Sequence, residues 1–310
     1  MGTFAIVAGC SVLFCSKGVV AKLAYRNGVD ALTVLTLRMA FSLPFFGVMA
    51  FSGSRTRPLA GVEVAKLAGL GFLGYYLSSL VNFTGLQYVS VGLERIILYT
   101  YPSLVLVLSK LFFRKPVRGV VWLASIGAWV GIATAFAGEL HNPLGSGKTA
   151  YGALLVFTSA LTYAVFLILS GNMLQAIGAI RFTGIVVGFS CVFMIGQHML
   201  VRPVGALLNL PAAVYAEGAV LALFGTVAPA ILMSQGLKRA GAQNFAVIST
   251  IGPVTTLFLA WAVLGERPNA AQGLGFVLTL GSGLIVSLRK DPAREEAPVK
   301  SQNSGMPCCR

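Results

Sequence analysis

The sequence predicts an all-α integral membrane protein with ten transmembrane helices, arranged as two inverted five-helix repeats. Hydrophobic residues make up 56% of its 310 residues and charged residues only 10%, with a mean hydropathy of +0.84. A soluble domain of this composition would expose a continuous apolar surface. The apolar runs are about 20 residues long, the helix length that crosses about 30 Å of hydrocarbon, and they lack the alternation of barrel strands. The arrangement into repeats follows from a similarity between the fourth and ninth runs.

Ten apolar runs follow one another, separated mostly by short connections that contain Gly, Pro, Asn or charged residues. Because lipid offers no hydrogen-bond partner to backbone N–H and C=O groups, each run is expected to form a helix. After Leu288 the residues become mainly polar and charged, and 290–310 is expected to be a disordered cytoplasmic tail. In chain order, the predicted helices span 3–24, 31–51, 67–86, 92–113, 119–136, 152–170, 182–201, 214–235, 242–264 and 271–288.

The distribution of basic residues predicts the orientation. If the N-terminus is cytoplasmic, ten spans place the C-terminus there as well. Fifteen of the 23 Lys and Arg residues then lie on the cytoplasmic side, five lie outside and three lie within spans. Cytoplasmic loops of membrane proteins carry such an excess, so topology explains the net charge of +14 without a nucleic-acid partner. We expect a multi-pass protein of the cell (inner) membrane with both termini in the cytoplasm.

Other motifs argue against a metal, a cofactor or a nucleotide. His141 and His198 have no partners at the spacing of a metal site. The segment 145–149 resembles the end of a phosphate-binding loop, but Asn142 stands where that motif needs Gly. An intramembrane enzyme would need a cluster of His, Asp, Ser or Cys at membrane depth, and the sequence shows none. Two stretches with Gly at every fourth residue, 127–131 and 184–188, predict close helix packing within the chain rather than a dimer interface.

The internal repeat is the strongest topological signal. Residues 85–102 align without gaps onto residues 236–253, which brings Pro102 onto Pro253 in the fourth and ninth runs. If a five-span unit is duplicated, the odd number of crossings turns the second copy upside down. Inverted repeats with interrupted helices are typical of secondary transporters, with a binding site near the midplane between the halves. The sequence thus predicts repeats over 1–138 and 139–289.

The same residues resemble a known family. The stretch Gly85-Leu86-Gln87-Tyr88-Val89-Ser90-Val91-Gly92-Leu93-Glu94-Arg95-Ile96-Ile97-Leu98-Tyr99-Thr100-Tyr101-Pro102 is similar to the fourth-helix signature of the EamA branch of the drug/metabolite transporter (DMT) superfamily. Ile251-Gly252-Pro253-Val254 followed by Leu264-Gly265-Glu266-Arg267-Pro268 resembles the matching signature of the second half, although Arg114-Lys115 in the first half departs from it. The resemblance covers 3–288. It implies two inverted five-helix EamA repeats around a central cavity and a carrier that works by alternating access.

Four ionisable residues lie inside the predicted spans: Lys17, Arg38, Glu94 and Arg95. Such residues cost about 2.5–3.5 kcal/mol each at a helix centre, so they are candidates for function. All four fall in the outer half of the membrane, within about 10 Å of the interface. We interpret them as a polar cluster in an outward vestibule, where Glu94 neutralises Arg38 or Lys17 and the remaining positive charge attracts a carboxylate or phosphate. In the alternative, Lys17 and Arg38 extend to lipid headgroups, and Glu94 and Arg95 only open a helix.

Adjacent Glu94 and Arg95 point about 100° apart on a helix, so at most one of them is expected to face a narrow cavity. Uncharged polar residues predict the rest of the lining. Tyr75, Ser79 and Asn82 recur at helical spacing on one face of the third helix. A proline inside a helix frees a carbonyl that can bind substrate or a cation, unless neighbouring Ser or Thr hydroxyls satisfy it. The helix kinks at Pro102 and Pro253 add four candidates, Tyr99, Tyr101, Ser249 and Thr250.

The sequence predicts a secondary active transporter that exports or exchanges a small metabolite, such as an amino acid, an organic acid or a related solute. Glu94 is the only acidic residue among the four of the polar cluster, hence the candidate for proton coupling. The alternative is a drug exporter of the same fold. Small multidrug resistance relatives carry a carboxylate deep in their first helix, where this chain has Lys17. An intramembrane enzyme or a channel fits the sequence less well than a carrier. The expected partners are a small-molecule substrate and membrane lipid, in a monomer or homodimer.

Overall fold

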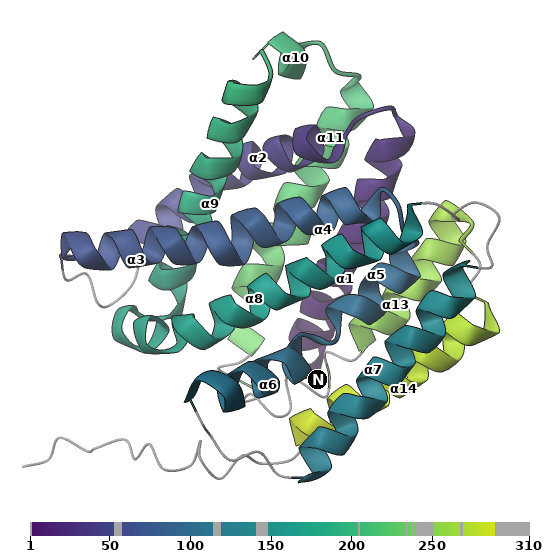
Figure 1. Ribbon diagram of the computed structural model, residues 1–310. Helices are drawn as coiled ribbons and strands as arrows, with labels where there is room; N and C mark the ends of the chain where they lie inside the picture. Colours follow the sequence, from purple (N-terminus) through teal and green to yellow (C-terminus); the bar gives the residue numbers. More distant parts are fainter. Residues whose placement is uncertain are drawn as a thin grey trace, which may run out of the picture.

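The computed structural model describes residues 2–52, 58–113, 119–140, 148–203, 205–233, 251–266 and 269–288, with isolated positions between 234 and 250. Regular structure in these ranges is helical throughout and contains no strand, which confirms the predicted all-α class. Figure 1 shows the helices packed into one bundle, with α7 and α14 side by side and α4 lying along α8. The predicted tail 290–310 lies outside the described residues.

The helices follow the predicted apolar runs closely. Up to residue 140 they are α1 (Gly2–Arg26), α2 (Ala31–Phe51), α3 (Gly61–Gly71), the π-helical turn η1 (Phe72–Leu77), α4 (Ser78–Leu86), α5 (Val91–Leu98), α6 (Tyr101–Phe113) and α7 (Gly119–Leu140). The remainder are α8 (Thr149–Ile177), α9 (Ala179–Val201), α10 (Gly205–Leu208), α11 (Ala212–Ala222), the π-helical turn η2 (Leu223–Val227), α13 (Ile251–Leu259), the π-helical turn η3 (Ala260–Leu264) and α14 (Ala270–Leu288).

Several of these helices can cross a membrane. In the described part of the chain, seven stretches are long and apolar enough, and 251–264 and 270–282 are shorter apolar helices. Each of the ten predicted runs contains helix, but the number of ten crossings stays a prediction. The seven stretches are Gly2–Arg26, Ala31–Phe51, Gly61–Leu86, Val91–Phe112, Thr149–Gly171, Ala179–Val201 and Ala212–Met233.

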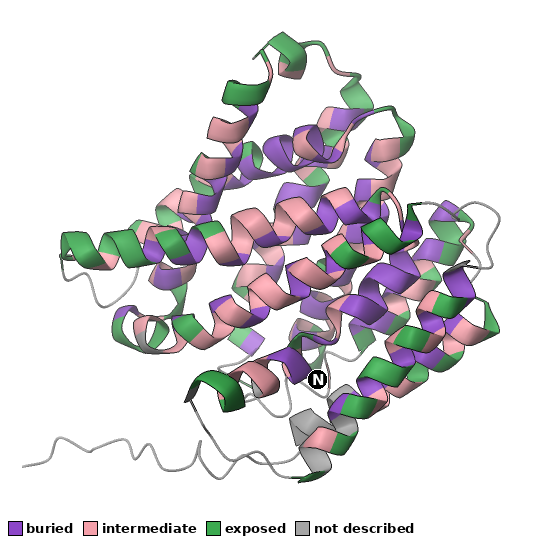
Figure 2. Ribbon diagram, in the orientation of Figure 1, coloured by how far each residue is buried: buried purple, intermediate pink, exposed green. Residues whose placement is uncertain are grey.

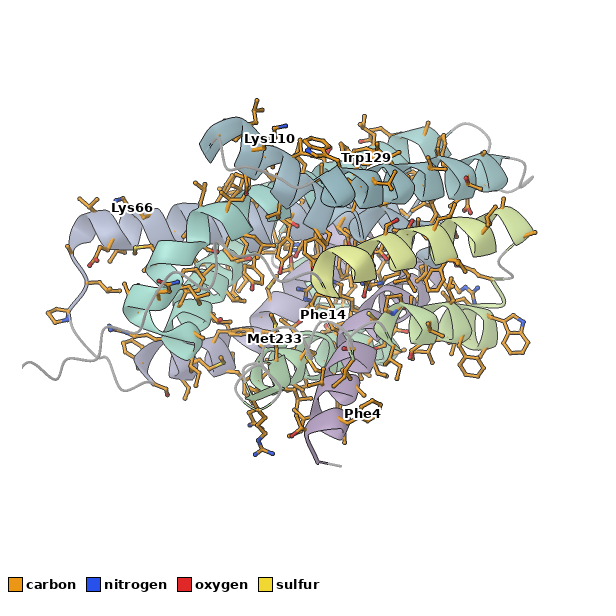
Figure 3. All side chains as sticks on the ribbon, turned by 90° about the horizontal axis from the view of Figure 1, so that it is seen from below. Phe4, Phe14, Lys66, Lys110, Trp129 and Met233 are labelled. Atoms are coloured by element: carbon orange, nitrogen blue, oxygen red, sulfur yellow. The ribbon has the colours of Figure 1, made fainter. Side chains whose placement is uncertain are left out.

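Large apolar side chains cover the outside of the bundle. Figure 2 shows buried residues concentrated where the helices meet and exposed residues on the outward faces and helix ends. Phe51 is 87% exposed and Leu200 is 90% exposed. Phe4 and Trp129 likewise point away from the bundle in Figure 3. A water-soluble protein would hide such side chains, whereas lipid solvates them, so this surface agrees with a membrane location.

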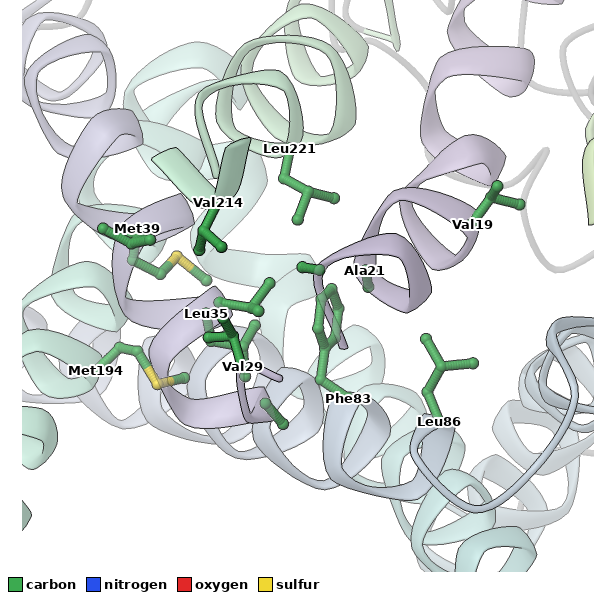
Figure 4. Close-up of a cluster of buried hydrophobic side chains, with 14 of the residues drawn as sticks. Val19, Ala21, Val29, Leu35, Met39, Phe83, Leu86, Met194, Val214 and Leu221 are labelled. Carbon is green, nitrogen blue, oxygen red and sulfur yellow. The ribbon is translucent and has the colours of Figure 1, made fainter. Parts of the chain in front are cut away.

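The main buried cluster joins helices that are distant in sequence. Ala21 of α1, Leu35 of α2, Phe83 of α4 and Leu221 of α11 belong to this cluster, which Figure 4 shows. In lipid the separation of helices exposes no apolar surface to water, so close van der Waals packing has to hold such helices together. This cluster therefore fixes α1, α2, α4 and α11 around the polar residues that lie beside it.

Small residues let two helix pairs come into backbone contact. A Cβ atom added at Gly131 of α7 would lie 2.5 Å from the Thr279 Oγ1 atom and 2.6 Å from the Gly275 carbonyl oxygen of α14. Gly184 of α9 lies against the backbone of α2 at Met49. These contacts are within the chain, as predicted for the two glycine stretches, although a Cβ at Gly188 would meet open space.

Two of the π-helical turns occupy equivalent positions in the chain. The gap-free spacing that aligns Pro102 with Pro253 also aligns Phe72 with Leu223, the first residues of η1 and η2. It also aligns Gly74 with Gly225. A π-helical turn inserts an extra residue into an α-helix and frequently marks a functional site. The third and eighth predicted runs therefore share a local irregularity that their apolar composition did not reveal.

The fourth run is not one helix kinked at Pro102. It is two helices, and the break between them lies before Pro102. Helix α5 ends at Leu98, and Pro102 lies in the first turn of α6, where a missing N–H costs little. The Thr100 hydroxyl donates to the Ile97 carbonyl at 2.6 Å, and the Ser103 hydroxyl donates to the Thr100 carbonyl at 2.8 Å. Both carbonyls also accept backbone N–H groups, and neither is the Leu98 carbonyl four residues before Pro102, so the role of that carbonyl stays a prediction. Pro253 is buried in α13.

Candidate functional site

The four ionisable residues predicted inside spans come together in the bundle. Glu94 and Arg95 of α5 and Arg38 of α2 are each at least 95% buried, and Lys17 of α1 is partly buried. Lys17 lies within electrostatic range of all three others. The structure therefore brings the four residues together, and their depth in the outer half of the membrane stays a prediction.

The pairing within the cluster differs from the expectation. Glu94 forms its ion pair with adjacent Arg95, at 3.2 Å from Oε2 to Nε, and not with Lys17 or Arg38. Its Oε1 atom accepts a hydrogen bond from the Asn82 side-chain amide at 3.1 Å. Both members of the pair are buried, because α5 is enclosed by helices on several sides and side chains about 100° apart can both be covered. That at most one of them faces a narrow cavity stays a prediction.

Gly18 provides the room for this pair beneath α1. A Cβ atom at Gly18 would lie 3.7 Å from the Arg95 Nη2 atom and 3.7 Å from the Glu94 Oε2 atom. The Cys15 carbonyl of α1 accepts hydrogen bonds from Arg95 Nη2 and from the Thr256 hydroxyl of α13, both at 3.2 Å. One backbone oxygen thus connects α1, α5 and α13. Ser249 and Thr250, predicted to lie beside this point, are outside the described residues.

Arg38 occupies a polar niche beside η2. Its Nε atom donates a hydrogen bond to the Thr226 hydroxyl at 2.9 Å, and the guanidinium carbon lies 5.2 Å from the centre of the Phe83 ring. The buried Nη1 atom has no hydrogen-bond partner among the described residues. Tyr75 of η1 is within electrostatic range of the guanidinium. Because Arg38 is 95% buried, its position does not fit the alternative in which it extends to lipid headgroups.

Lys17 also lies beside η2. Its Nζ atom is 4.2 Å from the centre of the Phe14 ring, a cation–π contact. A Cβ atom at Gly225 would lie 3.4 Å from the Lys17 Cβ atom, so the glycine lets α1 approach η2. Within the described part of the chain, neither Lys17 nor Arg38 forms an ion pair with a carboxylate.

The predicted tyrosines belong to an aromatic row. Tyr75 contacts Phe166 edge-on with ring centres 5.3 Å apart, and Tyr101 contacts Tyr163 with ring centres 5.7 Å apart. Tyr163 and Phe166 of α8 are themselves neighbours at 5.7 Å, so the row is continuous from η1 to α6. From the sequence, Tyr163 is a weaker candidate for the lining, and nothing marks Phe166 as lining. Tyr99 lies at the end of α5, and Ser79 is half-buried in α4.

A second polar site, which the sequence prediction missed, lies at the helix ends predicted to face outward. It is an open cavity of about 520 Å³ over the ends of α1 and α4. Its lining includes Lys22, Tyr25, Arg26, Asp30, Gln87 and Glu266. In the sequence, Lys22 and Arg26 counted only as loop charges and Glu266 only as part of a signature. Glu266 is one of just nine acidic residues, and that scarcity is the signal that could have drawn attention to it.

Polar contacts across this cavity join the two predicted repeats. The Lys22 ammonium forms an ion pair with Glu266 Oε1 at 2.9 Å. The Val91 backbone N–H, at the start of α5, donates to Glu266 Oε2 at 2.9 Å, and Arg26 donates to the Leu264 carbonyl at 2.6 Å. Glu266 therefore holds α1 and the N-terminus of α5 at once, an end where a carboxylate is stabilised by the helix dipole.

Further contacts at the same helix ends extend this closure. The Asn27 amide donates to Glu217 at 3.0 Å, and Arg202 forms an ion pair with Asp30 at 2.9 Å. The Ser90 backbone N–H and hydroxyl both donate to Glu139, at 3.0 and 2.9 Å, and Gln272 also donates to Glu139. We refer to the contacts made by Lys22, Arg26, Asn27, Asp30, Ser90 and Val91 with residues 139–272 as the outer closure.

Comparisons with known proteins agree with this architecture. The model of the EamA-like transporter family matches the chain twice, over residues 2–137 and 150–288. The uncharacterized transporter YcbK of Bacillus subtilis is 31% identical over 291 residues, which cover 90% of this chain and 91% of that protein. An uncharacterized transporter of Archaeoglobus fulgidus is 25% identical over 272 residues, covering 84% and 90%.

A likeness to a solved structure concerns the fold alone. One crystal structure superposes with a TM-score of 0.61 over 93% of this chain and 97% of that one, at 14% sequence identity. The names of the relatives point to a role other than catalysis. With its apolar helices and a family match over nearly its whole length, the chain belongs to the EamA-like transporter family and is a multi-pass membrane transporter of the DMT superfamily.

Proposed function

We propose that the protein is a secondary active transporter that exports or exchanges a small metabolite, such as an amino acid, an organic acid or a related solute, by alternating access. The observation that carries this proposal is the charged cluster buried between segments of both predicted repeats. Arg38 contacts Thr226, and the Cys15 carbonyl joins Arg95 to Thr256. Buried charges inside a membrane bundle are costly, and proteins keep them mainly along substrate and ion pathways.

The proposed architecture is ten helices in two inverted repeats over 1–138 and 139–289. Two features support it: the family model matches each part separately, and η1 and η2 begin at equivalent positions. With five crossings in each repeat, the second would be inverted and both chain ends would lie in the cytoplasm, where the excess of basic residues also puts them. The cell (inner) membrane is the proposed location.

The outer closure supports alternating access as the mechanism. Its contacts join the two proposed repeats at one end of the bundle, and a carrier that alternates must break such contacts when that end opens. Ion pairs and hydrogen bonds that are partly exposed suit this task, because each contributes only about 0–1 kcal/mol and can be exchanged for contacts with water. The structure would then represent the state in which the outer end is closed.

Glu94 is the proposed site of proton coupling, because it is the only carboxylate in the buried cluster. Its ion pair with Arg95 and its hydrogen bond with Asn82 supply partners that could change when it is protonated. A cationic-drug exporter is less well supported, because Lys17 and Arg38 leave the interior with surplus positive charge, which repels cations.

Counterflow in proteoliposomes tests the proposal. Vesicles preloaded with an unlabelled amino acid, organic acid or nucleoside should accumulate the labelled solute transiently and with saturation. A channel would equilibrate without this overshoot, and an enzyme would release a product. If no solute of a broad panel gives saturable counterflow, the transporter proposal for these solutes fails.

The same vesicles can test the role of Glu94 in proton coupling separately from solute exchange. Glu94→Gln should retain counterflow, which needs no net driving force, and should lose accumulation driven by a pH gradient. Lys66→Gln is the matched control, because Lys66 is exposed in α3 and far from the cluster. If Glu94→Gln inserts normally and still accumulates solute against its gradient, Glu94 does not couple protons.

A further inference from the structure

The buried interior has more positive charge than its own carboxylate can balance. Lys17, Arg38 and Arg95 belong to the buried cluster, and Glu94 is the one carboxylate in that cluster. Glu94 is already engaged, with Arg95 on one oxygen and the Asn82 amide on the other. In the described part of the chain, Lys17 and Arg38 are therefore left without a counter-charge.

Arg38 is held in place, yet incompletely satisfied. Its Nε atom is bound by Thr226, and the Phe83 ring supports the guanidinium, while Nη1 is buried without a partner. A buried charged donor without an acceptor is strongly unfavourable. A guanidinium presents its donors in a planar fork that matches the two oxygens of a carboxylate, so a fixed guanidinium with a free Nη1 is preorganised for an oxyanion.

The Thr226 hydroxyl, in the π-helical turn η2, orients Arg38. In a regular α-helix its hydroxyl would bond a carbonyl three or four residues back. Here Thr226 donates to the Leu221 carbonyl, five residues back, at 3.0 Å. With its hydrogen used in this way, the hydroxyl oxygen can only accept from Arg38. The equivalent turn η1 brings Tyr75 into range of the same guanidinium.

The cations belong to one repeat only. At the spacing that aligns Pro102 with Pro253, Arg38 aligns with Phe189 and Lys17 aligns with Ile168. A nearly symmetric pair of π-helical turns therefore surrounds positive charge contributed by the first repeat alone. Because a charge that served only to stabilise the repeated fold would be expected in both copies, this asymmetry suggests a role in binding a ligand.

We infer that the transported solute is an organic anion and that Arg38, through its free Nη1 atom and with Lys17 as second cation, binds its carboxylate or phosphate oxygens. The inference rests on the proposed transport function and narrows its substrate class. Phe83 and the row formed by Tyr75, Phe166, Tyr163 and Tyr101 offer apolar surface for the remainder of the solute.

The first test compares solutes that differ only in charge. Counterflow is measured for phenylacetate and phenylacetamide, for succinate and succinamide, and for glycerol 3-phosphate and glycerol. The inference expects at least one anion to exchange about 10-fold or more faster than its neutral partner. Saturable exchange of neutral or cationic solutes, with no anion preferred, would overturn the inference while leaving the transporter proposal intact.

The second test measures binding without transport. For a preferred anion, a saturating concentration should raise the Tm of the purified protein by about 2 °C or more, and its neutral partner should not. Arg38→Met keeps an unbranched apolar stem but removes the guanidinium and its charge, and it should abolish this shift. If Arg38→Met does not fold, Thr226→Val still tests the site, because losing the Nε partner should weaken the anion-induced shift several-fold. Lys66→Gln, which removes an exposed cation elsewhere, should leave the shift unchanged.

Anionic lipid headgroups are the competing source of an oxyanion. The same Tm assay distinguishes them from small anions. The Tm is compared in phosphatidylcholine nanodiscs with and without phosphatidylglycerol. A shift produced by phosphatidylglycerol that disappears in Arg38→Met, together with no response to the small anions, would make the site a headgroup site and refute the inference. A response to a small anion in phosphatidylcholine alone supports it. Unchanged anion shifts in both Arg38→Met and Thr226→Val would refute it as well.

Discussion

The Lys22–Glu266 ion pair should hold the outer end of the bundle closed, and Glu266→Gln should open it. The substitution keeps the size of the side chain but removes the charge that faces Lys22 at 2.9 Å and the N-terminus of α5 through Val91. Both ion-pair partners are about a fifth exposed, so their interaction contributes about 0.2–1 kcal/mol. A carboxylate at a helix N-terminus contributes about 0.3–1 kcal/mol.

Together these contributions amount to about 0.5–2 kcal/mol, which would change the ratio of closed to open states by about 2- to 30-fold. Leu86 is fully buried at the floor of the cavity and reports this change. A cysteine replaces it in a chain without its native cysteines, and the rate of labelling by a membrane-impermeant maleimide is measured. The rate should rise about 2- to 30-fold in Glu266→Gln.

Two comparisons decide whether the ion pair causes the effect. Lys22→Met should raise the labelling rate as well. In the double variant the labelling rate should rise by less than the product of the two single effects, because the two substitutions remove the same interaction. Glu63→Gln removes a partly exposed carboxylate at the start of α3, where it accepts the Ala60 N–H, and serves as the control. Unchanged labelling in Glu266→Gln, or fully multiplicative effects in the double variant, would refute the closure role.

Three further predictions concern stability and topology. Gly131→Ala should lower the free energy of unfolding by about 1–3 kcal/mol, because its Cβ atom would overlap α14. The control Gly47→Ala, which has open space around it, should not lower this free energy. Thermal unfolding in detergent measures both variants. Glu94→Gln should lower the free energy of unfolding by about 3–5 kcal/mol, because it leaves Arg95 buried and unpaired. Adding Arg95→Met should recover most of this loss. No recovery in the double variant would show that the broken pair is not the cause. Impermeant reagents should label tags at the two chain ends from the same side of the membrane, and labelling from opposite sides would exclude ten crossings.

The location of the charged cluster could be predicted from the sequence because depth follows from helix length. Counting residues from the ends of apolar runs placed Lys17, Arg38, Glu94 and Arg95 at similar depth, and the structure brings them together. Their pairing could not be predicted in this way. Which side chains meet depends on the rotation and approach of each helix, which here is set by Gly18 and by the helices around α5.

Two other features had no clear signal in the sequence. The π-helical turns arise within ordinary apolar runs, and η1 interrupts the regular helical spacing from which Tyr75, Ser79 and Asn82 were predicted to share a face. The outer closure was missed because its residues lie in connections, where charges are usually interpreted as solvated. Contacts such as Lys22 with Glu266 join positions 244 residues apart, and no local pattern encodes such a distance.

The glycine contacts between α7 and α14 restrict which helices can move. Where backbones touch without intervening side chains, one helix cannot slide or rotate without overlap, so these two should travel together as one unit. Motion that admits solute would then have to occur on the opposite side of the molecule, around α2 and η2. A spin label pair placed on α7 and α14 should accordingly keep a constant separation during turnover, while a pair linking α2 to η2 should not.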